Sequence, residues 1–302
     1  MIDSPEYGNM VPGQAAEILV AALPYIKHYR GRRIVIKYGG SAMTDGSLKR
    51  DFAVDVTLLS LIGMKPIIVH GGGPQIGELL KKIGKETRFV RGLRVTDEET
   101  MDVVEMVLVA KVNQDVVSMI NHHGGRAVGI SGRDGGLIKA KKAAPTGGAD
   151  IDEDLGLVGE VDSIEPDLIA SLEARDFIPV IAPVGSGPDG KPYNINADTA
   201  AGALSAALRA EKFILLTDVP GVLDANQQLI SSLSREEADE LIRSGVVSGG
   251  MIPKIRCCIS ALRGDVPKAH IIDGRVPHAL LLELLTDQGI GTEIVGEGPS
   301  GV

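Results

Sequence analysis

Short runs of β-branched and aliphatic residues alternate along the chain with longer stretches whose apolar side chains recur at helical spacing. The short runs predict buried strands, and the longer stretches predict amphipathic helices. Strands that alternate with helices favour a parallel or mostly parallel sheet covered by helices on both faces. The predicted strands cover residues 33–37, 66–70, 126–130, 178–182, 212–217 and 268–272, and the predicted helices cover residues 48–62, 75–83, 98–121, 166–174, 197–209 and 235–243.

Two regions interrupt this alternation. Residues 14–30 show an amphipathic pattern ahead of the first strand, with Ile18 and Ile26 among the apolar positions and Pro24 expected to bend the helix. Residues 139–162 combine glycine, proline and acidic residues with short strand-like pieces, which predicts a loop or a hairpin.

The composition is that of an ordinary globular protein. The 302 residues are 44% hydrophobic and 24% charged, so one large domain or two lobes can bury a core. The formal net charge of −9 disfavours nucleic acid as a partner, because an acidic protein repels a phosphate backbone. The N-terminal residues lack a signal-peptide pattern and no apolar run reaches about 18 residues, so we expect a cytoplasmic protein without a membrane span.

Cysteine and histidine give no sign of a metal centre or a catalytic triad. The two cysteines, Cys257 and Cys258, are adjacent, which is unfavourable for a structural disulfide and fits a reducing compartment. No Cys/His spacing predicts a zinc site, and none of the six histidines lies in a Ser/His/Asp arrangement. We therefore expect no dedicated metal site.

Two matches to G-x-G-x-x-G are expected to be turns. Residues 185–190 (GSGPDG) are followed by the extended sequence Lys191-Pro192-Tyr193 rather than by the helix that a dinucleotide-binding fingerprint must open. The second match, residues 296–301, leaves no room for a helix before the chain ends.

Two glycine-rich loops that follow predicted strands are stronger candidates for binding phosphate. Lys37 ends the first strand and leads into Gly39 and Gly40, whose N–H groups can approach an anion closely. After the second strand, glycines 71–73 precede Pro74, which suits the first turn of a helix whose N-terminus attracts anions. A plain turn remains the alternative interpretation of each loop.

Three further polar positions are candidates for ligand contacts. Asn194 and Asn196 alternate, so both side chains can face one side of an extended segment, and Asp198 then caps or begins a helix. Lys254 lies just inside a predicted helix N-terminus, where it needs a negative partner such as Asp198 or a phosphate. Arg94 precedes another helix and is suited to bind a carboxylate in a bidentate fashion. Helix capping and solvent-exposed side chains are the alternative interpretations.

No general base is evident beside the glycine loops. A hydroxyl acceptor usually needs such a base, whereas a carboxylate is already ionised at neutral pH and can attack phosphorus directly. Phosphoryl transfer depends mainly on positioning and on cancelling charge, which two lysines and two glycine loops can provide. The residues therefore favour transfer of a phosphoryl group from ATP to a small acidic acceptor.

Taken together, these motifs resemble the amino acid kinase family. The resemblance extends in order through nearly the whole chain, which makes it far more specific than any one phrase. Its phrases are VIKYGGSAM from Val35, VHGGGPQI from Val69, RGLRVT from Arg91, YNINAD from Tyr193, LLTDVPGVL from Leu215 and SGGMIPK from Ser248.

The resemblance implies an open three-layer αβα sandwich with a mainly parallel central sheet and two lobes. Residues 1–30 would be an N-terminal helical extension, residues 31–195 the acceptor-binding lobe and residues 196–302 the nucleotide-binding lobe. It implies ATP with Mg²⁺ as phosphoryl donor, the ion held mainly by phosphates and water. The phrases from Arg91 and Tyr193 favour N-acetyl-L-glutamate as acceptor, phosphorylated on its γ-carboxylate in arginine biosynthesis.

The resemblance also implies roles for individual residues. Lys37 and Lys254 would contact the transferring phosphoryl group and the ATP phosphates, with Asp198 orienting both lysines. The remaining implied contacts are Gly71, Gly72, Arg94, Asn194 and Asn196 with the acceptor, and Gly39, Gly40, Thr217 and Asp218 with ATP.

The predicted N-terminal helix matches an extension found in hexameric, arginine-inhibited members of the family. In those proteins the helices of neighbouring subunits interlace and join dimers into a ring, and arginine binds beside them. The positions that would contact arginine are Tyr25, Lys212, His270, Glu283 and Gly289. A helix docked on its own subunit is the alternative, and the resemblance leaves open a PII signalling protein as a partner.

Other interpretations come from within and outside the family. Related kinases act on aspartate, glutamate, carbamate or uridylate, and aspartate kinases usually carry regulatory domains for which this chain is too short. A non-catalytic nucleotide-binding regulator would lack Lys37, Asp198 or Lys254, and all three are present. An NAD-dependent dehydrogenase would require a strand–loop–helix fingerprint, which the sequence does not offer.

Overall fold

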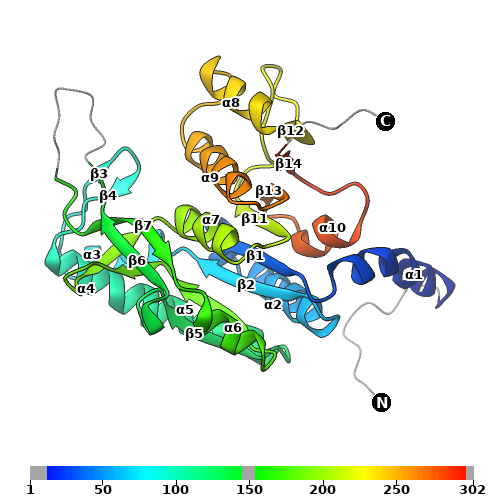
Figure 1. Ribbon diagram of the computed structural model, residues 1–302, viewed down its shortest axis with the longest axis horizontal. Coiled ribbons are helices and arrows are strands. Elements are labelled where there is room, and N and C mark those ends of the chain that lie inside the picture. The colour runs from blue at the N-terminus through cyan, green and yellow to red at the C-terminus, as the bar shows by residue number, and fades with distance from the viewer. Residues whose placement is uncertain (1–11, 145–153, 297–302) are drawn as a thin grey trace.

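The centre of the protein is a mainly parallel sheet, seen in a computed structural model that describes residues 12–144 and 154–296 (Figure 1). Within those residues the sheet has eight strands, and the six neighbours from β13 to β5 run parallel. At the other edge, β14 pairs antiparallel with β13, and β12 runs parallel to β14. The order across the sheet is β12 (Ser232–Ser234), β14 (Thr292–Val295), β13 (Lys268–Asp273), β11 (Lys212–Thr217), β1 (Arg33–Tyr38), β2 (Lys65–His70), β8 (Ile178–Ala182) and β5 (Ala127–Ser131).

Helices cover both faces of the sheet because each central strand is apolar on both sides. Along β1, Ile34 and Ile36 pack into one core cluster and Val35 into the other. One face is covered by α2 (Gly46–Leu61), α3 (Gly73–Lys82), α4 (Glu98–Glu105), α5 (Asn113–His122) and α10 (Ala279–Leu285), and the opposite face by α6 (Asp167–Glu173), α7 (Ala197–Ala207), α8 (Arg235–Arg243) and α9 (Met251–Arg263). The three-layer αβα architecture expected from the sequence is therefore present.

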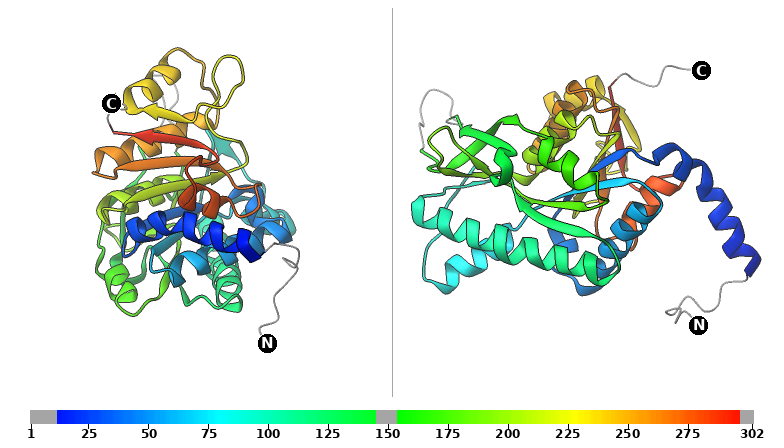
Figure 2. Two further views of the ribbon diagram at one scale, coloured as in Figure 1. Left: turned by 90° about the vertical axis from the view of Figure 1, so that its right-hand side faces the viewer. Right: turned by 60° about the horizontal axis from the view of Figure 1, so that its bottom comes forward.

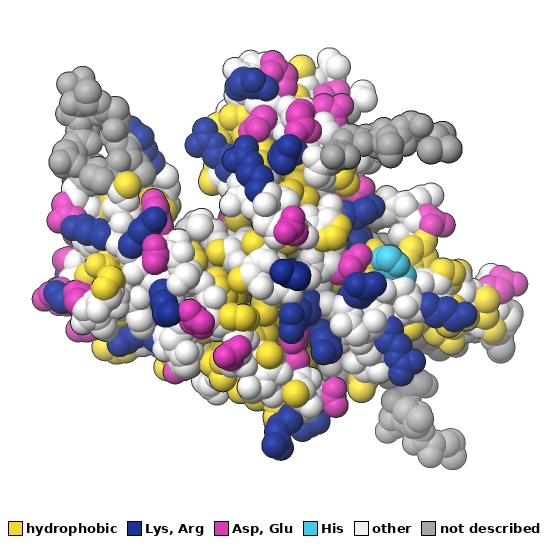
Figure 3. Space-filling model, viewed as in Figure 1, with side chains coloured by type: hydrophobic (Ala, Val, Ile, Leu, Met, Phe, Trp, Pro, Cys, Tyr) yellow, Lys and Arg dark blue, Asp and Glu magenta, His cyan; other side chains and the backbone are white. Residues whose placement is uncertain are grey.

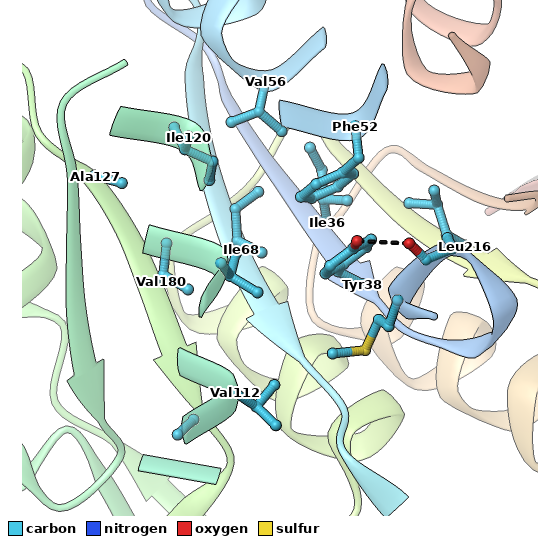
Figure 4. Close-up of a cluster of buried hydrophobic side chains, with 14 of the residues drawn as sticks. Ile36, Tyr38, Phe52, Val56, Ile68, Val112, Ile120, Ala127, Val180 and Leu216 are labelled. Carbon is cyan, nitrogen blue, oxygen red and sulfur yellow. Dashed lines mark hydrogen bonds between the residues drawn. The ribbon is translucent and has the colours of Figure 1, made fainter. Parts of the chain in front are cut away.

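The first of these core clusters includes an aromatic pair (Figure 4). The ring of Tyr38 at the end of β1 stacks on Phe52 of α2 with ring centroids 3.8 Å apart. The Tyr38 hydroxyl donates a hydrogen bond to the carbonyl oxygen of Ala42 at 2.7 Å. This contact anchors the short helix η1 (Gly40–Met43), which follows β1 directly.

Side-chain caps fix where several helices begin. Asp45 accepts hydrogen bonds from the N–H groups of Ser47 and Leu48 at the start of α2, and Asp97 accepts one from Thr100 at the start of α4. At α8, Ser234 and Glu237 form a reciprocal capping box. These polar residues satisfy N–H groups that have no partner inside the helix.

A small barrel and a hairpin lie beside the main sheet on its N-terminal half. The barrel contains β6 (Ile138–Lys142), β7 (Val158–Ile164), β9 (Val184–Ser186) and β10 (Pro192–Ile195), and the hairpin contains β3 (Phe89–Val90) and β4 (Leu93–Arg94). The hairpin expected within residues 139–162 corresponds to β6 and β7, and residues 145–153 lie outside the described chain. The GSGPDG motif forms the turn between β9 and β10, as predicted, while residues 297–301 of the second motif are not described.

The predicted helix over residues 98–121 is continuous but contains an irregular turn. A π-helical segment, η2 (Met106–Val112), joins α4 to α5. A further single-turn helix, η3 (Asp134–Gly136), follows β5. Wide π turns occur frequently at functional sites, and η2 places Leu108 against the second glycine loop.

Helix α1 (Pro12–Tyr29) projects from the body (Figure 2), and its C-terminal part contacts α10 and the start of β11. Its range is close to the predicted 14–30 and includes Pro24. Large apolar side chains on its described surface are exposed to solvent, among them Ile18, Leu19, Val20 and Leu23. Among the described residues, no helix combines the length and apolar character needed to cross a membrane.

All six predicted strands and six predicted helices are present, with ends shifted by at most two residues. The periodicity did not indicate β12, β14 or α10, which are short. The proposed division at residues 195/196 remains a prediction, because one continuous sheet combines strands from both halves of the chain.

Candidate active site

A hollow separates the part of the surface that carries β3 and β4 from the part that carries α8 and α9 (Figure 3). Helix α7 lies between these parts (Figure 1), close to the carboxyl ends of β1 and β2. In the sheet, β1 has β2 on one side and β11 on the other. The chain runs from β1 outward to β2, and it returns later to the opposite side of β1 with β11. Open α/β sheets bind ligands at the carboxyl ends of strands near such a reversal.

Three charged residues meet at this point, and we call them the charged trio. Lys37 Nζ, from β1, lies 3.0 Å from Asp198 Oδ1, and Lys254 Nζ, from the first turn of α9, lies 3.0 Å from Asp198 Oδ2. The sequence indicates either Asp198 or a phosphate as the negative partner of Lys254, and the structure brings Asp198 and both lysines together.

The trio is ionised and carries a net positive charge. Asp198 is 8% exposed, and burial alone would raise its pKa, but Lys37 and Lys254 together hold that pKa below its usual range. Two ammonium groups and one carboxylate leave one unbalanced positive charge, which suits an anionic ligand.

Asn196, rather than Asp198, caps α7. Its Oδ1 accepts hydrogen bonds from the N–H groups of Asp198 at 2.9 Å and Thr199 at 3.1 Å. Asp198 therefore lies inside the first turn, where its side chain is free to face the lysines. Asn194 and Asn196 alternate with buried residues of β10, as predicted, and Asn194 donates to Thr96 Oγ1 at 3.2 Å.

The first glycine loop fits tightly around its neighbours. A Cβ at Gly39 would lie 2.5 Å from Lys37 Nζ, so glycine there leaves space for the lysine to fold back toward Asp198. Gly40 has a φ of +71° and would clash with Asp218 if it carried a side chain. Asp218 accepts hydrogen bonds from the N–H and Oγ of Ser41, both at 2.6 Å. Asp218, predicted as an ATP contact, thus ties this loop to the end of β11.

Thr217 is the last residue of β11 and directly precedes Asp218. Its hydroxyl donates to the carbonyl oxygen of Val219 at 3.0 Å and shapes the turn after β11. The structure therefore places Thr217 and Asp218 beside the first glycine loop, where the sequence had put the nucleotide. Contact with ATP itself remains a prediction for both residues.

The second glycine loop forms the N-terminus of α3. Gly72 occupies the N-cap position without a side-chain cap, and Pro74 lies in the first turn, so N–H groups remain available to an anion. A side chain at Gly72 would clash with Leu108 of the π-helical segment. Leu108 had not been indicated as a site residue, because one leucine in a helix gives no sign of a wide turn.

The side chain of His70, just before this loop, has a structural role. Burial lowers its pKa to about 4, so the ring is neutral. Its Nδ1 lies 2.8 Å from the Gly71 carbonyl oxygen and its Nε2 lies 3.2 Å from Asn113 Nδ2. Both ring nitrogens are therefore used, with the proton on Nδ1 and Asn113 donating to Nε2.

Arg94 lines a cavity of about 190 Å³, which we call the Arg94 hollow. Its guanidinium donates to the carbonyl oxygen of Gly73 at 3.0 Å and to the hydroxyl of Thr87, and it lies 4.6 Å from the ring centroid of Phe89. The sequence had placed five other residues at the acceptor or in the loops beside it, and these also line the hollow: Gly71, Gly72, Gly73, Asn194 and Asn196.

The five residues predicted to contact arginine also meet, in a separate cavity of about 360 Å³ that we call the Tyr25 hollow. These residues are Tyr25, Lys212, His270, Glu283 and Gly289. The hollow lies between α1, α10 and the strands β11, β13 and β14, away from the charged trio.

Charged and polar side chains in the Tyr25 hollow contact one another. His270 Nδ1 lies 2.5 Å from Glu283 Oε1, and the Tyr25 hydroxyl donates to Asp287. Burial lowers the pKa of Lys212, while Glu283 opposes that shift. A Cβ at Gly289 would lie 2.9 Å from Glu283 Oε2, so glycine allows the backbone to approach the carboxylate.

Comparison with known proteins defines the class: residues 32–273 match the amino acid kinase family, and the chain belongs to it. Two curated relatives are acetylglutamate kinases. The one from Syntrophus aciditrophicus is 57% identical over 94% of this chain and 98% of its own length. The one from Chromobacterium violaceum is 55% identical over 93% of this chain and 97% of its own length.

Solved structures show the same fold. The N-acetylglutamate synthase from Neisseria gonorrhoeae complexed with coenzyme A and N-acetyl-glutamate is 26% identical, with a TM-score of 0.82 over 94% of this chain and 64% of that one. The carbamate kinase from Giardia lamblia bound to AMP-PNP is 17% identical, with a TM-score of 0.62 over 88% of this chain and 99% of that one. The second likeness concerns the fold alone.

Proposed function

We propose that the protein transfers the γ-phosphoryl group of ATP to the side-chain carboxylate of N-acetyl-L-glutamate. The product is N-acetyl-L-glutamyl 5-phosphate, an intermediate of arginine biosynthesis. The observation that carries this proposal is the charged trio, which lies beside the first glycine loop and next to Ala197, a residue of the Arg94 hollow. Relatives named acetylglutamate kinase, 57% and 55% identical over nearly the whole chain, support the choice of acceptor.

In this reaction the acceptor lies in the Arg94 hollow and the nucleotide reaches the trio from the side of α9. Arg94 pairs with the α-carboxylate, and Asn194 and Asn196 face the same space. The γ-carboxylate is ionised at neutral pH and attacks phosphorus without a general base. Lys37 and Lys254 balance the charge on the phosphoryl oxygens, while N–H groups of Gly39, Gly40 and Gly72 donate to oxygens of phosphate and acceptor. The N–H of Gly71, which the sequence also assigns to the acceptor, instead donates to the carbonyl oxygen of Tyr38 at 2.8 Å.

Mg²⁺ enters as part of the MgATP substrate. Both carboxylate oxygens of Asp198 lie 3.0 Å from lysine nitrogens, so this carboxylate is already paired. The ion is held by ATP phosphates and water, as is usual for Mg²⁺ in phosphoryl transfer.

The assay that tests this function measures the ADP formed from ATP with one acceptor at a time, and hydroxylamine traps the acyl phosphate wherever the acceptor is a carboxylate. The expected result is hydroxamate formation with N-acetyl-L-glutamate and little with aspartate, glutamate, carbamate or UMP. Turnover of one of those compounds without turnover of N-acetyl-L-glutamate would show a sibling kinase. ATP binding without turnover of any acceptor would show a non-catalytic regulator.

We also propose that arginine inhibits the enzyme by binding in the Tyr25 hollow, and that α1 joins dimers into a hexamer. The hollow gathers Glu283, Glu293 and Asp287 around one space, and carboxylates suit the guanidinium and ammonium groups of arginine. Helix α1 borders this space and exposes Ile18, Leu19 and Val20, which a neighbouring subunit would cover.

Removal of residues 1–31 tests both parts of this second proposal. The expected result is an active dimer whose inhibition by arginine is much weaker than that of the full chain. Light scattering with and without arginine measures the assembly, and the hydroxamate assay measures inhibition. A full-length dimer that is indifferent to millimolar arginine would end the proposal while leaving the catalytic one intact. Co-elution with a PII signalling protein would test that partner separately.

A further inference from the structure

Cys257 makes an unusual contact with the charged trio. Its Sγ donates a hydrogen bond to the backbone carbonyl oxygen of Asp198 at 2.7 Å. Cys257 follows Lys254 by three positions on α9, so both side chains leave the same face of the helix. Helix α9 therefore contacts Asp198 twice: Lys254 reaches its carboxylate and Cys257 reaches its main chain.

Gly202 makes room for this thiol. A Cβ at Gly202 would lie 2.7 Å from Cys257 Sγ, so any larger residue would force the two helices apart. Gly202 is four residues after Asp198, which places it one turn further along α7 on the same face. Close packing of α7 on α9 is repeated near the other end of the pair, where a side chain at Gly264 would clash with Ala206.

The Cys257 thiol stays protonated and therefore remains a hydrogen-bond donor. Burial raises the pKa of Cys257 to about 12, so the S–H proton stays in place throughout the working pH range. The carbonyl of Asp198 belongs to the first turn of α7, and a second donor there restrains the backbone from which the catalytic carboxylate projects.

We propose that Cys257 is a positioning residue for phosphoryl transfer, one that fixes the first turn of α7 on α9 and so keeps the Asp198 carboxylate between Lys37 and Lys254. The proposal rests on the proposed function, since it concerns the same trio. It assigns the thiol no contact with substrate. A buried cysteine that only fills space is the competing explanation, because free cysteine often packs as a small apolar side chain.

Cys258 provides a matched control for the proposal. It is the next residue of α9 and is fully buried in the same core cluster, but the hydrogen bond to Asp198 comes from Cys257. Four variants compare the two positions: Cys257→Ala, Cys257→Ser, Cys258→Ala and Cys258→Ser. Each is measured for kcat, for KM of both substrates and for Tm.

Cys257→Ala should lower kcat by about 3- to 10-fold, the range that corresponds to one neutral hydrogen bond, with KM values near those of the wild type. Cys257→Ser, which keeps a donor, should recover most of that loss. Cys258→Ala should lower Tm to a similar degree as Cys257→Ala but leave kcat within about twofold. Equal kcat for the two alanine variants, or no recovery in Cys257→Ser, would overturn the proposal.

An infrared measurement checks the contact independently of activity. The chain has two cysteines, so Cys258→Ala retains one thiol, and its S–H stretching band should appear at the lower frequency of a hydrogen-bonded thiol. A band at the frequency of a free thiol would contradict the proposal. Wild-type protein that does not phosphorylate N-acetyl-L-glutamate would instead count against the proposed function, whatever the thiol band shows.

Discussion

Replacement of Arg94 by lysine separates binding of the acceptor from binding of ATP. Lysine keeps the positive charge but lacks the planar fork that pairs with a carboxylate through two parallel hydrogen bonds. The existing contacts with Gly73, Thr87 and Phe89 hold the guanidinium in one orientation before substrate arrives. Arg94→Lys therefore removes one charge-assisted hydrogen bond to substrate and part of this preorganisation.

A charge-assisted hydrogen bond contributes about 1.5–3 kcal/mol, which corresponds to an increase of about 10- to 150-fold in KM for N-acetyl-L-glutamate. KM for ATP should stay near the wild-type value, because Arg94 lines the acceptor cavity rather than the first glycine loop. Steady-state kinetics with hydroxylamine trapping, varying one substrate at a time, gives both constants.

Arg91→Lys is the matched control, because Arg91 lies in the same hairpin but is exposed. It should leave both KM values unchanged. Equal increases in the two KM values for Arg94→Lys would indicate that Arg94 supports the structure of the loop rather than the substrate. Similar effects of the two substitutions would refute the assignment of the α-carboxylate to Arg94.

Three further predictions concern the loops and the trio. Lys37→Ala and Lys254→Ala should each lower kcat about 10²- to 10³-fold with smaller changes in KM, and near-normal kcat would remove that lysine from the mechanism. Gly40→Ala places a side chain at a φ of +71° against a carboxylate, which costs about 1–3 kcal/mol and should raise KM for ATP, whereas Gly46→Ala, with open space around it, should not. The third prediction concerns His70, whose pKa is about 4 in the folded protein, below its ordinary value of 6.5. As the pH falls, the unfolded chain therefore takes up the proton first, and the free energy of unfolding decreases between pH 6.5 and 4. By pH 5 this decrease amounts to about 2 kcal/mol. His70→Gln should therefore show a smaller loss between pH 7 and 5 in urea unfolding, and an unchanged loss would contradict burial of a neutral ring.

The sequence predicts most of the regular elements because their apolar pattern is local. A strand such as β8, buried along its whole length, and a helix such as α8, with its capping box, can each be recognised without reference to the rest of the chain. The short strand β14 could not be recognised, since its stability comes from pairing with β13 and β12. Closure of β6, β7, β9 and β10 into a barrel likewise depends on partners that are distant in sequence.

Only part of the candidate site could be predicted from local sequence patterns. Glycines next to Lys37 and after His70 indicated anion loops, because the first N–H groups of a helix have no partner inside that helix. That Lys37 and Lys254 share Asp198 came from family resemblance, since no local pattern brings together residues 217 positions apart. The thiol of Cys257 gave no signal, because its role depends on the missing side chain of Gly202, one helix away.

Charge balance at the site explains why a carboxylate is a suitable acceptor. His70, the imidazole next to the second glycine loop, is neutral and uses both ring nitrogens in hydrogen bonds, so it is not free to take a proton from a hydroxyl group. Asp198 is held ionised by two lysines, and its pKa is too low for it to accept a proton at neutral pH. An acceptor that arrives ionised needs neither group as a base. What it needs is positive charge, because the carboxylate and the phosphoryl oxygens repel one another as they approach. The trio supplies that charge and keeps it in place, since Asp198 fixes both lysines before either substrate binds.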